Sequence, residues 1–305
     1  MKNIVFMLIF TIDMFAIELK PIPQSINVDI NIVKLGKKLF FDKNLSKDGL
    51  LSCNSCHKLS DNGATRTKYT KGASGIYGNF NVPTVYNAVY NFRQFWDGRA
   101  KDLIDQATNP IENPIEMANT IENALKYLKE NKLYYKQFNS LFNDGVTKRN
   151  LAISLAEFER YLITPNSPFD KYLRGDKSAL SKEAIKGYKL FQQKGCISCH
   201  NGINIGGNLY NKLGIYDKIN SKELGRYNIT HRTIDKYVFK VPSLRNVALT
   251  PPYIHDGRAK TLTDAINIMS KYQLGDILNS NEINFIIAFL KSLTGELDRY
   301  KNVSN

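Results

Sequence analysis

Cysteine, histidine and tryptophan are scarce in this chain, and the shortage excludes several classes of protein. Its 305 residues include four cysteines, four histidines and one tryptophan. The sequence has no zinc-finger spacing, RNA-binding aromatic signature or concentrated basic arm, so we expect no nucleic-acid partner. Beyond the amino terminus no apolar run approaches the length of a membrane span. Lysine and arginine outnumber the acids by 42 to 28, and the net charge of +14 favours acidic partners or surfaces without informing the fold.

The amino terminus has the pattern of an export signal. It reads "MKNIVFMLIFTIDMFAIELKPIPQ", with a short basic start and an apolar run from 4 to 12 that is too short to cross a bilayer. We therefore predict a secretory signal peptide over 1–18 and a periplasmic location. Asp13 interrupts the apolar run and the cleavage site near Ala16 is poorly formed, so an uncleaved anchor is the alternative.

The four cysteines share one setting, a Cys-x-x-Cys-His motif that occurs twice. Its members are Cys53, Cys56 and His57 in the first copy and Cys196, Cys199 and His200 in the second. The motif is typical of c-type haem attachment, because two thiols on one helical turn reach the vinyl groups of a porphyrin and the adjacent histidine reaches the iron. A single copy leaves zinc, a dithiol switch and disulfides open. Zinc needs further ligands, and the other histidines are only His231 and His255. Two copies that use every cysteine favour two covalently bound c-type haems.

The duplication extends beyond these motifs. "GKKLF" (36–40) and "GYKLF" (187–191) precede them, and "VPTVYNAVYNFRQFWDGRAKDL" (82–103) aligns without a gap on "VPSLRNVALTPPYIHDGRAKTL" (241–262). Each half closes with an amphipathic run at helical spacing, over 150–164 and 281–295. A period this long indicates two homologous domains and not a solenoid.

We therefore predict a mainly α protein made of two cytochrome c-like haem domains related by internal duplication. The segment "ITPNSPFDKYLRGDKSALS" (163–181) is rich in turn formers and is the expected joint. The amino-terminal domain is expected over 19–164 and the carboxy-terminal domain over 165–305.

The two halves differ where a second axial ligand of the iron is expected. In the second half Met269 follows the "DGRAK" element, and His/Met ligation raises a reduction potential, which suits electron entry. A core methionine is the alternative. In the first half the corresponding segment, 102–120, carries Gln106, Glu112 and Glu116. A carboxylate there can move a proton between the two oxygens of a peroxide. Spacing alone does not choose between the two glutamates, and we expect Glu112 on a solvated helix.

In all these motifs the chain resembles the bacterial dihaem cytochrome c peroxidases. The resemblance covers nearly everything after the signal, through "PTVYNAVYNFRQFWDGR", "EMANT", "ITPNSPFD", "PSLRNVALTPPYIHDGR" and "MSKYQLG" in order. It implies that the haem at Cys53, Cys56 and His57 is the low-potential peroxidatic centre. The haem at the second motif, with Met269, would accept electrons from a small cytochrome c or cupredoxin. The family also suggests a homodimer.

The resemblance implies a role for further positions. Glu116 and Gln106 would line the peroxidatic pocket, with Glu116 assisting O–O cleavage, and Trp96 would carry electrons between the haems. A calcium ion would bind at the domain interface through Asn81 and the backbone carbonyls of Thr250 and Pro252, an oxygen set that suits calcium. His255 aligns with Trp96 in the repeat and is expected to contact a propionate or the scaffold of the second haem.

One departure from the family concerns the peroxidatic iron. Many members carry a histidine on the loop before "PT" that caps this iron at rest, but the loop here, 67–84, has none, and the family position falls near Ala73. Tyr69, Tyr77 and Lys71 are the alternative ligands. Glycines at 72, 75 and 78 favour a mobile loop. Our hypothesis is that this iron rests open or with water and needs less reductive activation.

Other functions are consistent with parts of the pattern. A pure dihaem electron carrier requires two six-coordinate irons, against the unequal halves. A dihaem oxidase of the methylamine-utilisation type carries a tyrosine at the second haem, where this chain has Met269. A disulfide-bonded secreted binding protein conflicts with the use of every cysteine in a haem motif.

Overall fold

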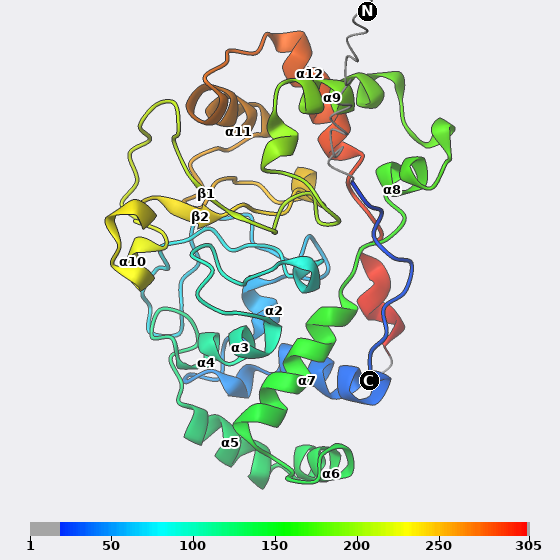
Figure 1. Cartoon of the computed structure of the whole chain (residues 1–305). Helices are drawn as coiled ribbons and strands as arrows, with labels where there is room; N and C mark the ends of the chain where they lie inside the picture. Colours follow the sequence, from blue (N-terminus) through cyan, green and yellow to red (C-terminus); the bar gives the residue numbers. More distant parts are fainter. Residues whose placement is uncertain (1–18, 304–305) are drawn as a thin grey trace, which may run out of the picture.

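The computed structural model describes residues 19–303 (Figure 1). The predicted signal over 1–18 lies outside this range. No helix among the described residues is both long enough and apolar enough to cross a membrane.

Helices dominate the described chain, which confirms the mainly α prediction. The first half contains α1 (Ile30–Phe41), η1 (Lys43–Leu45), α2 (Cys53–Cys56), η2 (Ala88–Tyr90), α3 (Leu103–Ala107), α4 (Asn109–Glu112), α5 (Ile121–Glu130), α6 (Lys132–Leu141) and α7 (Lys148–Tyr161). The second contains α8 (Pro168–Leu173), η3 (Lys177–Ala179), α9 (Lys182–Gln193), η4 (Cys196–Ser198), α10 (Tyr227–Thr230), η5 (Thr233–Asp235), η6 (Val247–Leu249), α11 (Leu262–Ile268), η7 (Met269–Leu274), α12 (Ser280–Lys291) and η8 (Asp298–Asn302). Strands β1 (Tyr210–Lys212) and β2 (Val238–Lys240) pair antiparallel.

Each half is built around one pair of crossing helices. In the first half α1 packs on α7, and in the second α9 packs on α12. Both crossings depend on a glycine at the same motif position. A Cβ on Gly36 would overlap the Ser154 carbonyl of α7, and a Cβ on Gly187 would overlap the Phe285 carbonyl of α12. The "G-x-K-L-F" motifs therefore let two backbones approach closely.

Two large apolar clusters form the core, one in each half. The first draws on α1, α5, α6 and α7, and the second on α8, α9 and α12. Each end of the described chain packs in the core of the opposite half. Leu19 lies in the second cluster and Val303 in the first. The two terminal segments run side by side (Figure 1). Arg299 Nη1 donates to the Gln24 carbonyl at 2.9 Å. A linear division of the sequence does not anticipate this exchange, and the boundary at 164 stays a prediction.

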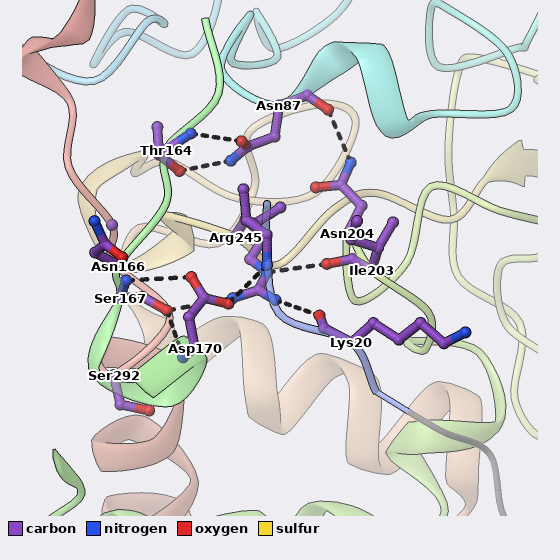
Figure 2. A network of polar contacts seen from close by, with 12 residues as sticks. Lys20, Asn87, Thr164, Asn166, Ser167, Asp170, Ile203, Asn204, Arg245 and Ser292 are labelled. Carbon is purple, nitrogen blue, oxygen red and sulfur yellow. Dashed lines mark hydrogen bonds and ion pairs between the residues drawn. The ribbon is translucent and has the colours of Figure 1, made fainter. Parts of the chain in front are cut away.

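A buried ion pair holds the joint between the halves (Figure 2). Arg245 and Asp170 lie 2.7 Å apart and both side chains are at most 1% exposed. Arg245 also donates to the carbonyl of Lys20, and Asp170 accepts from the backbone N–H of Ile22, each at 3.0 Å. The hydrogen bonds satisfy both charges, as burial of an ion pair requires. The pair thereby fixes the start of the described chain to the carboxy-terminal half.

Candidate functional site

The first Cys-x-x-Cys-His motif presents a neutral histidine with one nitrogen engaged. The backbone N–H of His57 donates to the carbonyl of Cys53 at 2.8 Å, at the end of α2. Its Nδ1 lies 3.1 Å from the Pro83 carbonyl and 3.3 Å from that of Gly63. Because Nδ1–H donates to a carbonyl, the lone pair is on Nε2, which suits metal binding. Burial lowers the pKa of His57, so the neutral form is favoured.

The second motif holds its histidine at the equivalent place, but without a hydrogen bond to Nδ1 in the described chain. The N–H of His200 donates to the carbonyl of Cys196 at 3.0 Å. Burial lowers the pKa of His200 to about 4, opposed by the carbonyls of Pro242 and Ile205. Its Nδ1 is buried and makes no hydrogen bond within the described residues. In the aligned repeat Pro242 corresponds to Pro83, so the same proline carbonyl faces the histidine in each half.

The four cysteines are free thiols held near these histidines. Burial raises the pKa of Cys53 above that of an ordinary thiol, and raises that of Cys196 to about 11. The thiols of Cys53 and Cys196 therefore stay protonated at neutral pH. They are partly buried, not sealed into the core, so they remain available to a ligand at each site.

Met269 and the second histidine line one cavity. This cavity of about 280 Å³ is bordered by Cys196, Cys199, His200 and Met269, and most of its remaining walls are apolar. Met269 begins η7, a π-helical turn that continues α11, and such turns are frequent at functional sites. An apolar cavity with a neutral imidazole, a thioether and two thiols fits a haem.

In the first half the segment 102–120, here called the distal element, provides polar groups instead of a thioether. The Oε1 atom of Gln106 on α3 is buried and has no partner within the described residues. Glu116 accepts a hydrogen bond from Asn113 Nδ2 at 2.7 Å. Burial raises its pKa, with Arg99 the largest opposing influence. Met117 is 5% exposed and packs in the first core cluster. An orphaned amide oxygen and a partly desolvated carboxyl are groups that a small polar ligand can engage.

Glu112 lies at the surface, at the end of α4. Its carboxylate is 44% exposed and pairs with Lys148 at 3.0 Å. An open cleft of about 460 Å³ lined by Arg99, Glu112 and Asn113 adjoins the distal element. Asn113, which lines this cleft, also donates to the Glu116 carboxylate.

The loop over 67–84 is docked on the distal element through its backbone. The N–H of Ala73 donates to the carbonyl of Glu116 at 2.7 Å. Gly72 lies so close to Ile115 that a Cβ would overlap its carbonyl. Among the three alternative iron ligands on this loop, Tyr77 is 61% exposed and Lys71 is also exposed, which leaves only Tyr69 half-buried.

Trp96 and the predicted calcium ligands meet at the boundary between the halves. The indole Nε1–H of Trp96 donates to the Asn81 carbonyl at 2.8 Å, and Asn81 Nδ2 donates to Thr67. Asn81, Thr250 and Pro252 line the same cavity as Met269. No cluster of three or more His, Cys, Asp or Glu able to hold a metal occurs between residues 19 and 303, so the calcium prediction depends on amide and carbonyl oxygens.

His255 is a buried contact residue of this cavity. It is 2% exposed, stacks on Phe239 with ring centroids 4.3 Å apart, and has its Nε2 2.8 Å from the hydroxyl of Ser221. Burial lowers the pKa of His255 to about 4. Its Nε2 is therefore occupied by the Ser221 hydroxyl, and the role of His255 as a propionate or structural contact stays a prediction. His231 is exposed at the end of α10.

Two buried ionisable side chains escaped the sequence reasoning. Glu159 on α7 is 7% exposed, and burial raises its pKa to about 8. Its charge raises the pKa of Cys53. Lys240 on β2 is also 7% exposed, and burial lowers its pKa to about 8. The alignment of the repeats could have drawn attention to Lys240, because it falls opposite Asn81. No sequence signal marked Glu159.

Comparison with known proteins gives consistent matches along the chain. A family model described as di-haem cytochrome c peroxidase matches residues 31–178, and a cytochrome c model matches 184–294. A cytochrome c551 peroxidase of Nitrosomonas europaea is 45% identical over 93% of this chain and 86% of its own length. That of Pseudomonas aeruginosa is 42% identical over 92% and 85%. A solved structure of a MauG-like protein associated with microbial copper homeostasis has a TM-score of 0.80 at 25% identity, covering 94% of this chain and 96% of that one.

Proposed function

The chain belongs to the di-haem cytochrome c peroxidase family and is an oxidoreductase that acts on peroxide, and from that premise we propose how its two halves divide the reaction. Hydrogen peroxide would take up two electrons and two protons at the first motif and leave as two waters. A small cytochrome c or cupredoxin would deliver the electrons at the second motif. The unequal distal sides carry this proposal, with Glu116 and Gln106 in one half and Met269 in the other.

The two haems that the family implies would be attached through the cysteines of each motif. The haem supplies the iron and the redox chemistry when bound, and His57 and His200 would each offer Nε2 to it. Addition of a thiol S–H across a vinyl group forms the thioether without net oxidation. All four cysteines are free for this reaction.

At the first motif Glu116 would move the protons. Its partly buried carboxyl can accept a proton from one oxygen of the peroxide and return it to the other, which makes the departing oxygen a better leaving group. Asn113 holds this carboxyl in place at 2.7 Å. The orphaned Oε1 of Gln106 would accept a hydrogen bond from the peroxide.

At the second motif Met269 would complete the iron coordination and raise the reduction potential. Trp96 would carry electrons from this half to the first, since it lines the cavity of the second motif and belongs to the chain of the first half. Calcium at Asn81, Thr250 and Pro252 would fix this boundary. We also propose export to the periplasm and assembly as a homodimer.

We further propose that the peroxidatic iron rests without a protein ligand on its distal side. The loop that carries the capping histidine in many relatives has none here, and its own backbone is held to Glu116 through Ala73. The candidate ligands Lys71 and Tyr77 are exposed. A spectrum in which both ferric haems are fully low-spin with nitrogen ligands would contradict this resting state.

A dihaem oxidase that acts on a partner protein is the second candidate function. The likeness to a MauG-like structure favours it, whereas Met269 opposes it because that type carries a tyrosine at the second haem. A non-catalytic carrier requires a protein or strong-field ligand on both irons, which the polar distal side of the first motif opposes.

The test is peroxide-dependent oxidation of a reduced cytochrome c by the fully ferric protein, without pre-reduction. Rapid turnover supports both the peroxidase and the open resting iron. Turnover that begins only after half-reduction keeps the peroxidase and rejects the open iron. No turnover in either state rejects the proposed donor reaction and favours the partner-protein oxidase or the carrier.

A further inference from the structure

The internal duplication places a lysine opposite a proposed calcium ligand. The gap-free repeat extends back to Phe80 and Phe239, so Asn81 corresponds to Lys240 and Trp96 to His255. The structure preserves this correspondence across the boundary between the halves. The N–H of Asn81 donates to the carbonyl of His255 at 2.8 Å, and the N–H of Lys240 donates to that of Trp96 at 2.8 Å. Asn81 and Lys240 are therefore equivalent positions.

The ammonium group of Lys240 has no anionic partner in the described chain. The residue is 7% exposed, and its side chain makes no hydrogen bond or ion pair within residues 19–303. Burial is the sole influence on its pKa, which falls to about 8, so no neighbouring acid is close enough to oppose it. A buried cation without a counter-ion is costly, and natural proteins pair such groups.

The cavity next to Lys240 supplies no carboxylate. Lys240 lines the same cavity as Cys196, His200 and Met269, and none of the described residues around that cavity is an aspartate or glutamate. Asp97, the residue that follows Trp96 in the chain, is already paired with Arg99 at 2.8 Å. An anion for Lys240 must therefore arrive with the ligand that fills the cavity. A haem carries two carboxylate side chains, its propionates.

We propose that Lys240 is a cofactor-binding residue whose ammonium group binds a propionate of the haem held by Cys196, Cys199 and His200. In the second half the protein itself would supply a positive charge through Lys240. At the equivalent position in the first half, beside Asn81, a bound calcium ion would supply it. This inference depends on the assignment of a haem to the second motif. It does not depend on which molecule donates electrons.

The expected consequence is electrostatic. Reduction adds one negative charge to the haem, so a fixed cation nearby favours the reduced state and raises the potential. The pair with a propionate also shields that carboxylate, whose own charge acts in the opposite direction. Removal of the ammonium group therefore lowers the potential of the second haem.

The test uses the complete holoprotein with Lys240→Met, which keeps the chain length and removes the charge. Lys240→Arg restores a cation, and Lys260→Met removes an exposed lysine just before α11 in the same half. Pyridine haemochrome assay first establishes two haems per chain in every variant. Optical redox titration, without peroxide or donor, then gives the potential of each haem. The second haem is identified as the one whose spectrum changes in Met269→His.

We expect Lys240→Met to lower the equilibrium constant for reduction of the second haem at least tenfold. This change corresponds to a fall of about 59 mV in its reduction potential, for a one-electron couple. Lys240→Arg should recover most of this change, and Lys260→Met should leave the potential near that of the parent. An unchanged potential in Lys240→Met with both haems present overturns the inference. A change confined to the first haem overturns it too, because the propionate would then belong to that haem. Because the potentials are measured without peroxide or donor, a failure of peroxide turnover changes neither the expected result nor the result that overturns the inference.

Discussion

The two halves share a scaffold and differ in the ionisable groups that face their haem motifs. Both close a helix crossing over a glycine, and both orient a histidine towards the same proline carbonyl of the repeat. Near its motif the first half places the partly buried Glu116 and the buried Glu159, whereas the second places the buried base Lys240. The duplication therefore preserved the frame and changed the charges. Ionisable groups of opposite sign would allow one frame to hold the two haem centres of unequal reactivity that we propose.

The largest expected effect tests whether proton transfer belongs to the first half. Glu116→Gln should lower kcat for peroxide at least 100-fold, because general acid–base groups contribute about 10²–10⁴-fold. Glu112→Gln is the matched control, since it removes an acid of the same segment that is exposed and paired with Lys148. Steady-state oxidation of reduced cytochrome c measures both. Equal losses in the two variants would place the chemistry elsewhere.

The buried acid of the first half should make stability depend on pH. The pKa of Glu159 rises from 4.5 to about 8 on burial, so between these values the folded state holds a proton that the unfolded state has released. Stability therefore falls as pH rises through this window, by roughly 5 kcal/mol in total.

Glu159→Gln should remove that fall, because glutamine stays neutral. Urea unfolding of the two holoproteins at pH 5 and pH 9 measures the difference. If the parent and the variant lose the same stability over this range, Glu159 is not the titrating group.

The glycine crossings should respond alike, which tests the shared frame. Gly36→Ala and Gly187→Ala should each cost about 1–3 kcal/mol, since a methyl group forces two backbones apart. Gly78→Ala is the control, because its Cβ has only ordinary contact distances around it. Thermal unfolding measures all three. A large cost in one half alone would show that the crossings are not equivalent.

The smallest expected effect distinguishes the roles of Trp96 and His255, which occupy equivalent positions of the repeat. Trp96→Phe and Ser221→Ala each remove one hydrogen bond of such a ring, at a cost of about 0.5–1.5 kcal/mol. Only Trp96→Phe should also slow cytochrome oxidation, if the indole carries electrons between the halves. Equal turnover in the two variants would leave Trp96 a packing residue.

The parts of the fold that depend on short segments could be predicted from the sequence. Each Cys-x-x-Cys-His motif, the "G-x-K-L-F" helices and the amphipathic closing helices are complete within a few residues, so periodicity and spacing predict the helices and the duplication. The family comparisons support the dihaem peroxidase reading that these motifs favoured. The individual site residues remain predictions.

Long-range contacts account for what the sequence did not reveal. Glu159 lies on the amphipathic helix α7, where nothing in the pattern separates a buried acid from a solvated one. The docking of Gly72 and Ala73 on the distal element joins segments that are far apart in the chain, and glycines had favoured a mobile loop. The Arg245–Asp170 pair and the crossed ends likewise depend on residues brought together only by the complete fold.

The crossed ends also make the core of the first half depend on the carboxy-terminal end of the described chain. Val303 belongs to the core of the half that is made first, and Lys37 Nζ donates to its carbonyl at 2.7 Å. That core is complete only when residue 303 is present in the folding chain. A chain truncated before η8 would lack Val303 and the contact of its carbonyl with Lys37. Loss of the carboxy-terminal end would therefore be felt in the amino-terminal core.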